Sequence, residues 1–131
     1  MSATNSSVVD ANVVLRYLLQ DDENLYRRAR EFFHRVRDAQ ETAYFPDGVV
    51  AECIYVLAGR YGVKRDEIAA RLLELIAFRG VDPQNRRLLQ AALDLYRSHN
   101  VDFVDAVVAA TARERGWRVF SFDRDLERLA K

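Results

Sequence analysis

Four carboxylates in this sequence stand among apolar residues, where an unpaired charge is costly. Each ends or interrupts an apolar run, and the four are Asp10, Glu52, Asp105 and Asp123. Glu52, for example, is the only charge between Val49 and Leu57. Nearby cations are too few to pair with all four acids. The pattern therefore predicts that the four acids share one functional site.

Carboxylates brought together in a fold need a counter-ion. Two of them ~4 Å apart repel by about 4 kcal/mol at an effective dielectric constant of 20. A hard divalent cation relieves this repulsion, and a water held on such an ion is a nucleophile for phosphodiesters. The chain has 20 basic and 20 acidic side chains, so without these four acids the balance is 20 to 16, or +4. A slightly basic protein around an acidic site suits a polyanionic substrate whose charge is bridged to the acids by a metal ion.

Local structure offers another explanation for three of these acids. Asp105 follows Asp102 by three residues, a spacing typical of a helix start, where acids complement the helix dipole. Asp123 could cap a last helix, and Asp10 could serve only a turn. Glu52 has the weakest structural explanation.

Hydrophobic periodicity predicts alternating strands and helices. We expect strands at 7–10, 42–45 and 117–122, with a very short one at 80–83. We expect helices from residue 11 onward and at 23–39, 49–58, 65–78, 84–98, 102–116 and 124–131. Strands separated by helices pair in parallel through right-handed crossovers. The fold class is therefore α/β, a three-layer α/β/α sandwich with a small, mostly parallel sheet, whose ligands gather at the carboxyl ends of strands.

Composition narrows the class of protein further. With 131 residues, 50% of them apolar and 31% charged, the chain is expected to form a single domain over residues 1–131. Cys53 is the only cysteine, which favours a reducing, cytoplasmic location. Met1–Ser7 is polar and no uncharged apolar run approaches the ~20 residues that span a bilayer, so no membrane association is expected. His34 and His99 lie in charged helical patterns, and no glycine-rich phosphate loop is present.

The acids belong to an ordered set of motifs that covers nearly the whole chain. The motifs are Val8–Asn12, Val49–Glu52, Asp102–Ala112 and Phe120–Leu126. In order, spacing and total length the sequence resembles the PIN-domain nucleases, and more narrowly the VapC-type ribonuclease toxins of toxin–antitoxin pairs. The resemblance implies an endoribonuclease that uses Mg²⁺ or Mn²⁺ and a metal-activated water to cleave RNA.

The resemblance also implies roles for individual residues. Asp10 and Asp105 would be the main metal ligands, completed by Glu52 and Asp123 directly or through water. Asn12 and Ser121 would orient these carboxylates by hydrogen bonds, with Ser121 standing where the family often has threonine. Three further acids stay open as contributors: Asp125 as a replacement for Asp123, and Asp47 or Asp102 as outer charge.

Partners follow from the same resemblance. Family members commonly form homodimers and are inhibited by a small antitoxin protein in a groove between N-terminal helices. Tyr17, Leu18 and parts of Leu25–Val36 could line such a groove or simply pack in the core. The alternative function is a non-cleaving PIN-like module that binds RNA or protein. A haloacid-dehalogenase-like phosphatase is disfavoured because it needs a second aspartate where Asn12 stands, and a receiver domain because only Lys64 and Lys131 are lysines.

Overall fold

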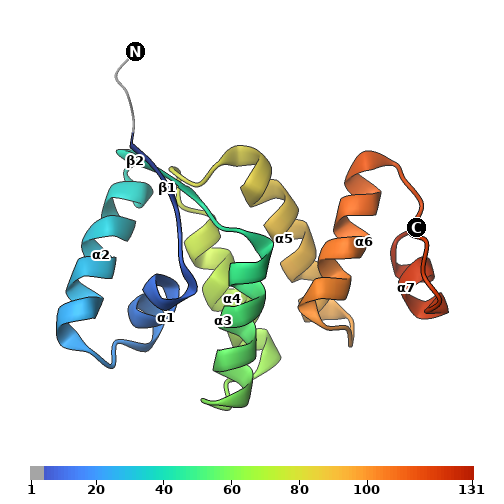
Figure 1. Ribbon diagram of the computed structural model, residues 1–131, viewed down its shortest axis with the longest axis horizontal. Coiled ribbons are helices and arrows are strands. Elements are labelled where there is room, and N and C mark those ends of the chain that lie inside the picture. The colour runs from blue at the N-terminus through green and yellow to red at the C-terminus, as the bar shows by residue number, and fades with distance from the viewer. Residues whose placement is uncertain (1–4) are drawn as a thin grey trace.

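The computed structural model describes residues 5–131, in which helices predominate over a small sheet (Figure 1). The strands are β1 (Asn5–Val8) and β2 (Glu41–Tyr44). The helices are α1 (Ala11–Leu19), α2 (Glu23–Arg37), α3 (Asp47–Gly59), α4 (Arg65–Ile76), α5 (Pro83–Ser98), α6 (Phe103–Arg115) and α7 (Arg124–Leu129). Residues 1–4, which begin the polar Met1–Ser7 stretch, lie outside the described residues. The single domain over residues 1–131 stays a prediction.

The sheet is parallel, as predicted. β1 pairs with β2 from Asn5 opposite Glu41 to Val8 opposite Tyr44. On the other side of β2, Ala43 forms an isolated parallel bridge with Val81. The short strand predicted at 80–83 is therefore present only as this single bridge. Hydrogen bonds through Ala43 therefore occupy the outer edge of β2. The outer edge of β1 has no partner strand within residues 5–131.

Gly80 allows the chain to pass very close to the start of β2. Its N–H donates to the Val36 carbonyl oxygen at 2.8 Å. A Cβ atom at residue 80 would lie 2.2 Å from the Glu41 carbonyl oxygen and 2.5 Å from that of Val36. Both are backbone atoms with little freedom to move, so the close approach requires glycine.

Helix ends follow the chemistry of their sequences. Asp22, Asp82 and Asp102 each accept a hydrogen bond from a backbone N–H in the first turn of the helix that follows. Pro83 stands at the first position of α5, and Gly116 ends α6 in the left-handed conformation with φ of 68°. The predicted helices are thus confirmed to within a few residues at their ends.

A single cluster of buried side chains links the sheet to the helices. Phe33 of α2 stacks on Phe45, just after β2, with ring centroids 6.3 Å apart. Leu89 and Leu93 of α5 are fully buried in the same cluster. The predicted α/β/α fold class with a small parallel sheet is confirmed. No helix within residues 5–131 is long and apolar enough to cross a bilayer.

The strand predicted at Trp117–Phe122 is wrong for this structure. These residues form an irregular segment that leads from α6 to α7, at the far end of the molecule from β1 and β2 (Figure 1). Phe120 is 89% exposed and Phe122 is 96% exposed. The alternating pattern typical of a strand is present, but strand structure needs a neighbouring strand to pair with. At its position beyond α6 the segment has none.

Candidate active site

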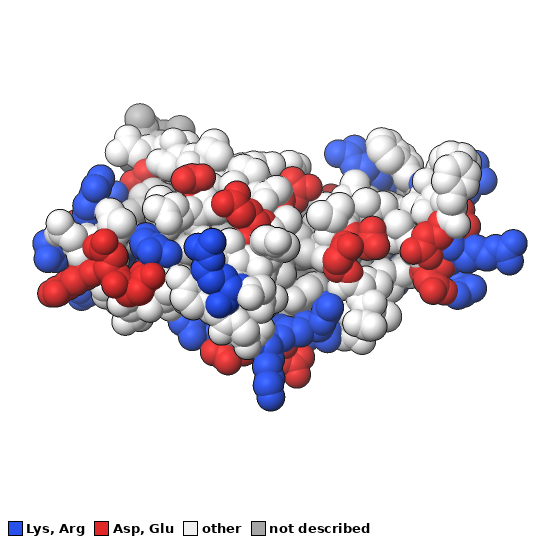
Figure 2. Space-filling view, turned by 60° about the horizontal axis from the view of Figure 1, so that its bottom comes forward, with Lys and Arg blue, Asp and Glu red and all other residues white. Residues whose placement is uncertain are grey.

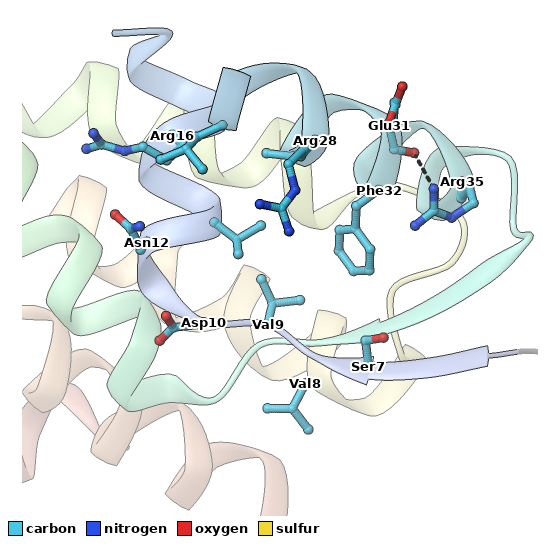
Figure 3. A pocket seen from close by; sticks show the side chains of 13 residues that line it. Ser7, Val8, Val9, Asp10, Asn12, Arg16, Arg28, Glu31, Phe32 and Arg35 are labelled. Atoms are coloured by element: carbon cyan, nitrogen blue, oxygen red, sulfur yellow. Dashed lines mark hydrogen bonds between the residues drawn. The ribbon is translucent and has the colours of Figure 1, made fainter. Parts of the chain in front are cut away.

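Asp10 lies where β1 gives way to α1, at the carboxyl end of the strand, as predicted. It occupies the N-cap position of α1, but its side chain makes no capping hydrogen bond. Asn12 is in the first turn of the same helix, and both residues line a groove between α1 and α2 (Figure 3). The Asp10 carboxylate accepts no hydrogen bond from residues 5–131, and the expected bond from Asn12 is not among those formed there. The Asp10 side chain therefore makes no hydrogen bond that would stabilise a turn, and its carboxylate is free for other partners within residues 5–131.

The charges of Asp10 and Glu52 both act on the Cys53 thiol. Cys53 is fully buried in α3, and its Sγ donates to the Ala11 carbonyl oxygen at 3.7 Å. Burial raises the pKa of Cys53 to about 12, and the negative charges of Glu52 and Asp10 add to the effect. Such a thiol is not a nucleophile. Cys53 is thus a small core residue, and Asp10 and Glu52 form a first acidic neighbourhood around it.

Asp105 forms a second acidic neighbourhood with Asp102 and Asp123. The Asp105 N–H donates to the Asp102 carboxylate at 2.9 Å, which fixes the first turn of α6. Partial burial raises the pKa of Asp105, and repulsion from Asp102 and then from Asp123 raises it further. Asp102 and Asp123 are thus close enough for their charges to act on Asp105.

Asp123 and the residues beside it are engaged in local structure. The Asp123 carboxylate accepts hydrogen bonds from the N–H groups of Asp125 and Leu126 at 2.9 and 3.3 Å, so it caps α7. The Ser121 hydroxyl accepts from the Asp123 N–H at 3.0 Å, which holds the backbone of the turn instead of a carboxylate. Asp125 forms an ion pair with Arg128. In this arrangement the capping explanation accounts for Asp123.

A groove of about 760 Å³ runs between α3 and the start of α6. Glu52 lines it from α3, and Asp102 lines it from the cap of α6. Tyr55 and Val104 contribute exposed apolar surface to the same groove. The groove is thus lined by one acid from each neighbourhood, Glu52 from the first and Asp102 from the second.

The acids do not gather into one compact metal site in this arrangement. Within residues 5–131, no three His, Cys, Asp or Glu side chains lie close enough together to hold a metal ion. Figure 2 shows acidic groups at several separate places across one face, with basic groups between them. The oxygen donors suit a hard cation, but their placement does not form a site for one. The two neighbourhoods would have to come together to do so.

Two residues that the sequence analysis did not single out hold the elements carrying the acids. Asn85 of α5 is buried, accepts from the Phe45 N–H at 2.8 Å and donates to the Phe45 carbonyl oxygen at 2.9 Å. It thereby fixes the chain just before α3. Arg65 donates to the carbonyl oxygens of Tyr96 and Val101 at 2.7 and 2.8 Å, which fixes the chain that leads into α6. An asparagine or arginine in a helical pattern gives no sequence signal of such contacts.

Comparison with known proteins agrees with this fold. The PIN domain family matches residues 7–131, so the chain belongs to that family. A curated VapC ribonuclease of Aquifex aeolicus (strain VF5) is 23% identical over 123 residues, which cover 93% of this chain and 90% of the relative. No solved structure gives a significant match.

Proposed function

We propose that this protein is a metal-dependent endoribonuclease and the toxin of a type II toxin–antitoxin pair. The observation that carries the proposal is the PIN family match over residues 7–131, which includes all four candidate acids. A relative described as a VapC ribonuclease is similar over almost the full chain. The proposed cofactor is Mg²⁺ or Mn²⁺, the substrate RNA, the active form a homodimer and the location the cytoplasm.

The residues on which we expect cleavage to depend are Asp10, Glu52, Asp105 and Asp123. Asp10, Glu52 and Asp105 support this role because their carboxylates accept no hydrogen bond and form no ion pair within residues 5–131. Asp10 and Glu52 are exposed and Asp105 is half-buried, so all three carboxylates are accessible to a cation or a substrate. Asn12, Ser121 and Asp125 are proposed to support these acids.

The second candidate function is a non-cleaving PIN-like module that binds RNA or protein. The separation of the acids into two neighbourhoods favours it. The cleavage assay described next distinguishes the two candidates. Only a nuclease cleaves RNA and loses that activity when one carboxylate becomes an amide.

The decisive experiment is incubation of end-labelled structured RNAs with purified protein in Mg²⁺, Mn²⁺ or EDTA. We expect discrete cuts that require the metal and that disappear in Asp105→Asn. Asp66→Asn, which alters an exposed carboxyl on α4, is the matched control and should cut as the unaltered protein does. Equal cutting by Asp105→Asn would overturn the assignment of the site. Absence of both cutting and metal binding by calorimetry would support the binding module.

The toxin role has its own test. Expression of the protein alone should arrest growth, and co-expression of a small protein encoded beside it should restore growth. The Asp105→Asn variant should be harmless at the same level of soluble protein. Unimpaired growth with abundant unaltered protein would contradict the toxin role but not the nuclease chemistry.

The antitoxin is proposed to bind the groove between α1 and α2, which has a volume of about 540 Å³ (Figure 3). Tyr17 does not line it, because its ring packs on Phe33 with centroids 4.8 Å apart. Apolar groups such as Phe32 line the groove together with Arg28, which forms no ion pair within residues 5–131. This surface suits a partner segment with apolar and acidic side chains. Arg28→Glu should therefore weaken capture of the co-expressed partner, and unchanged capture would exclude this groove.

A further inference from the structure

Arg65 has more hydrogen-bonding capacity than its structural contacts use. Nη1 donates both of its N–H groups, one to the Tyr96 carbonyl oxygen at 2.7 Å and one to that of Val101 at 2.8 Å. Nε and Nη2 have no acceptor among residues 5–131, and neither atom is buried. Since a guanidinium carries five N–H groups, three of them remain accessible to solvent.

The position of this guanidinium is fixed. Its central carbon lies 4.1 Å from the centroid of the Tyr96 ring, so the ring holds one face of the group while the two carbonyls hold one edge. Arg65 forms no ion pair within residues 5–131. The free edge of Nε and Nη2 matches two oxygens of a phosphate or a carboxylate, which a guanidinium binds through two parallel hydrogen bonds. Arg65 therefore offers a preformed site for such an anion.

The Arg65 side chain lines the groove between α3 and α6. Two of the acids described above, Glu52 and Asp102, line the same groove. Arg65 also donates to the carbonyl oxygen of Val101, which directly precedes Asp102 in the chain. The groove thus combines a fixed positive group with acids from both neighbourhoods. A phosphate bound by Arg65 would lie in the groove that these acids line, as the cleavage of a bound RNA strand requires.

An exposed aromatic ring lies in the same groove. Tyr55 is 78% exposed and follows Glu52 by three residues on α3, so the two side chains lie on one face of the helix. Val104 of α6, which is 58% exposed, adds apolar surface. Aromatic rings beside positive groups are the combination with which proteins hold the bases and the backbone of single-stranded RNA. The apolar part of the groove therefore suits a base.

We propose that the groove between α3 and α6 binds the single-stranded RNA beside the cleaved bond, with Arg65 holding a phosphate and Tyr55 stacking on a base. Such binding deepens the proposed function, on which it rests, by naming residues that hold the RNA near the acids. Both contacts are independent of RNA sequence, because every nucleotide has a phosphate and a flat base. Selectivity for a particular RNA must then arise from other contacts.

The salt dependence of RNA binding tests the phosphate contact. A fluorescein-labelled single-stranded RNA is titrated with protein in EDTA at several salt concentrations, and fluorescence anisotropy gives the affinity. Arg65→Gln should weaken binding at least about tenfold, because hydrogen bonds to a charged group are lost. It should also reduce the slope of log K against log salt by about 0.7, the value for one phosphate contact on a single strand.

The matched control is Arg27→Gln, which removes one exposed positive charge on α2, outside the groove. It should leave the affinity and the slope unchanged. A slope that Arg65→Gln does not alter would overturn the phosphate contact, even if the affinity falls. Absence of RNA binding by the unaltered protein, in EDTA and in Mg²⁺, would overturn it equally.

Arg65 also holds the chain that leads into α6, so its role in binding must be separated from its role in folding. Arg65→Lys keeps the charge but loses the planar edge, and it should keep the salt slope while binding RNA less tightly. Circular dichroism shows whether each variant is folded. If neither folds, phenylglyoxal modification of arginines in the unaltered protein, followed by mass spectrometry, decides. RNA should slow the modification of Arg65 and not that of Arg27, and no protection of Arg65 would refute the contact.

Substitutions of Tyr55 test the stacking contact. Tyr55→Ala should weaken RNA binding by about 5- to 150-fold without changing the salt slope, because stacking involves no phosphate. Tyr55→Phe keeps the ring and should bind as the unaltered protein does. Tyr61→Ala, at a tyrosine 44% exposed outside the groove, is the control and should have no effect. Equal losses in Tyr55→Ala and Tyr55→Phe would contradict stacking.

These assays measure binding, so they fail independently of the proposed function. A protein that binds RNA through Arg65 and Tyr55 but never cuts it would refute the nuclease and keep the groove. A protein that cuts RNA while both sets of variants bind it normally would refute the groove alone. Protection of Arg65 from phenylglyoxal by polyglutamate, and not by RNA, would assign the anion site to an acidic protein segment and overturn the proposal.

Discussion

Asn85 offers the sharpest test of how the fold positions the candidate site. Its side chain satisfies both backbone groups of Phe45, a residue only 2% exposed at the junction of β2 and α3. Asn85→Ala removes the acceptor and the donor together, so a buried N–H and a buried carbonyl lose their partners. Each unsatisfied group costs about 1 to 3 kcal/mol. Water entering the space left by the side chain offsets part of this, so we expect a loss of about 2 to 4 kcal/mol in the free energy of unfolding.

That loss is a large share of the roughly 5 to 15 kcal/mol that stabilise an ordinary domain. For a chain of this length it corresponds to a melting temperature about 10 °C lower. Urea denaturation followed by circular dichroism measures it directly. The matched control is Gln84→Ala, at the preceding and exposed position of α5, which should change the stability by less than about 0.5 kcal/mol. A difference below about 1 kcal/mol between the two variants would refute the idea that Asn85 holds the chain before α3.

Three other predictions concern charge, close packing and reactivity. The pKa of Asp105 is raised in the folded protein, so the folded state disfavours the ionised carboxyl. In metal-free buffer, Asp105→Asn should therefore stabilise the protein increasingly as pH rises from about 4 to 7. A difference in denaturation midpoint that does not change with pH would contradict this. Gly80→Ala should cost about 1 to 3 kcal/mol in the same urea assay, since its Cβ would meet backbone oxygens, and an unchanged midpoint would show that the close approach relaxes freely. Cys53, with its pKa raised to about 12, should react with a thiol reagent at pH 8 only after denaturant is added, and rapid reaction of the folded protein would refute its burial.

Local chemistry made much of the fold readable from the sequence. The helices end where aspartate caps, a proline and a glycine place them, and these signals act within one or two turns of the chain. The parallel pairing of β1 and β2 followed from the helices between them. The four acids could be selected because a charge inside an apolar run is conspicuous in any fold.

Tertiary structure alone decided where these pieces lie relative to one another. Phe120 and Phe122 carry the alternation of a strand, but pairing depends on whether an edge is within reach, and the contacts of Arg113 and Trp117 with neighbouring elements hold the segment beyond α6. The grouping of the acids also depends on helix packing that no local pattern encodes. The sequence by itself therefore determined the elements and the candidate residues, because capping and periodicity act over a few residues. Only long-range packing decided which acids are neighbours.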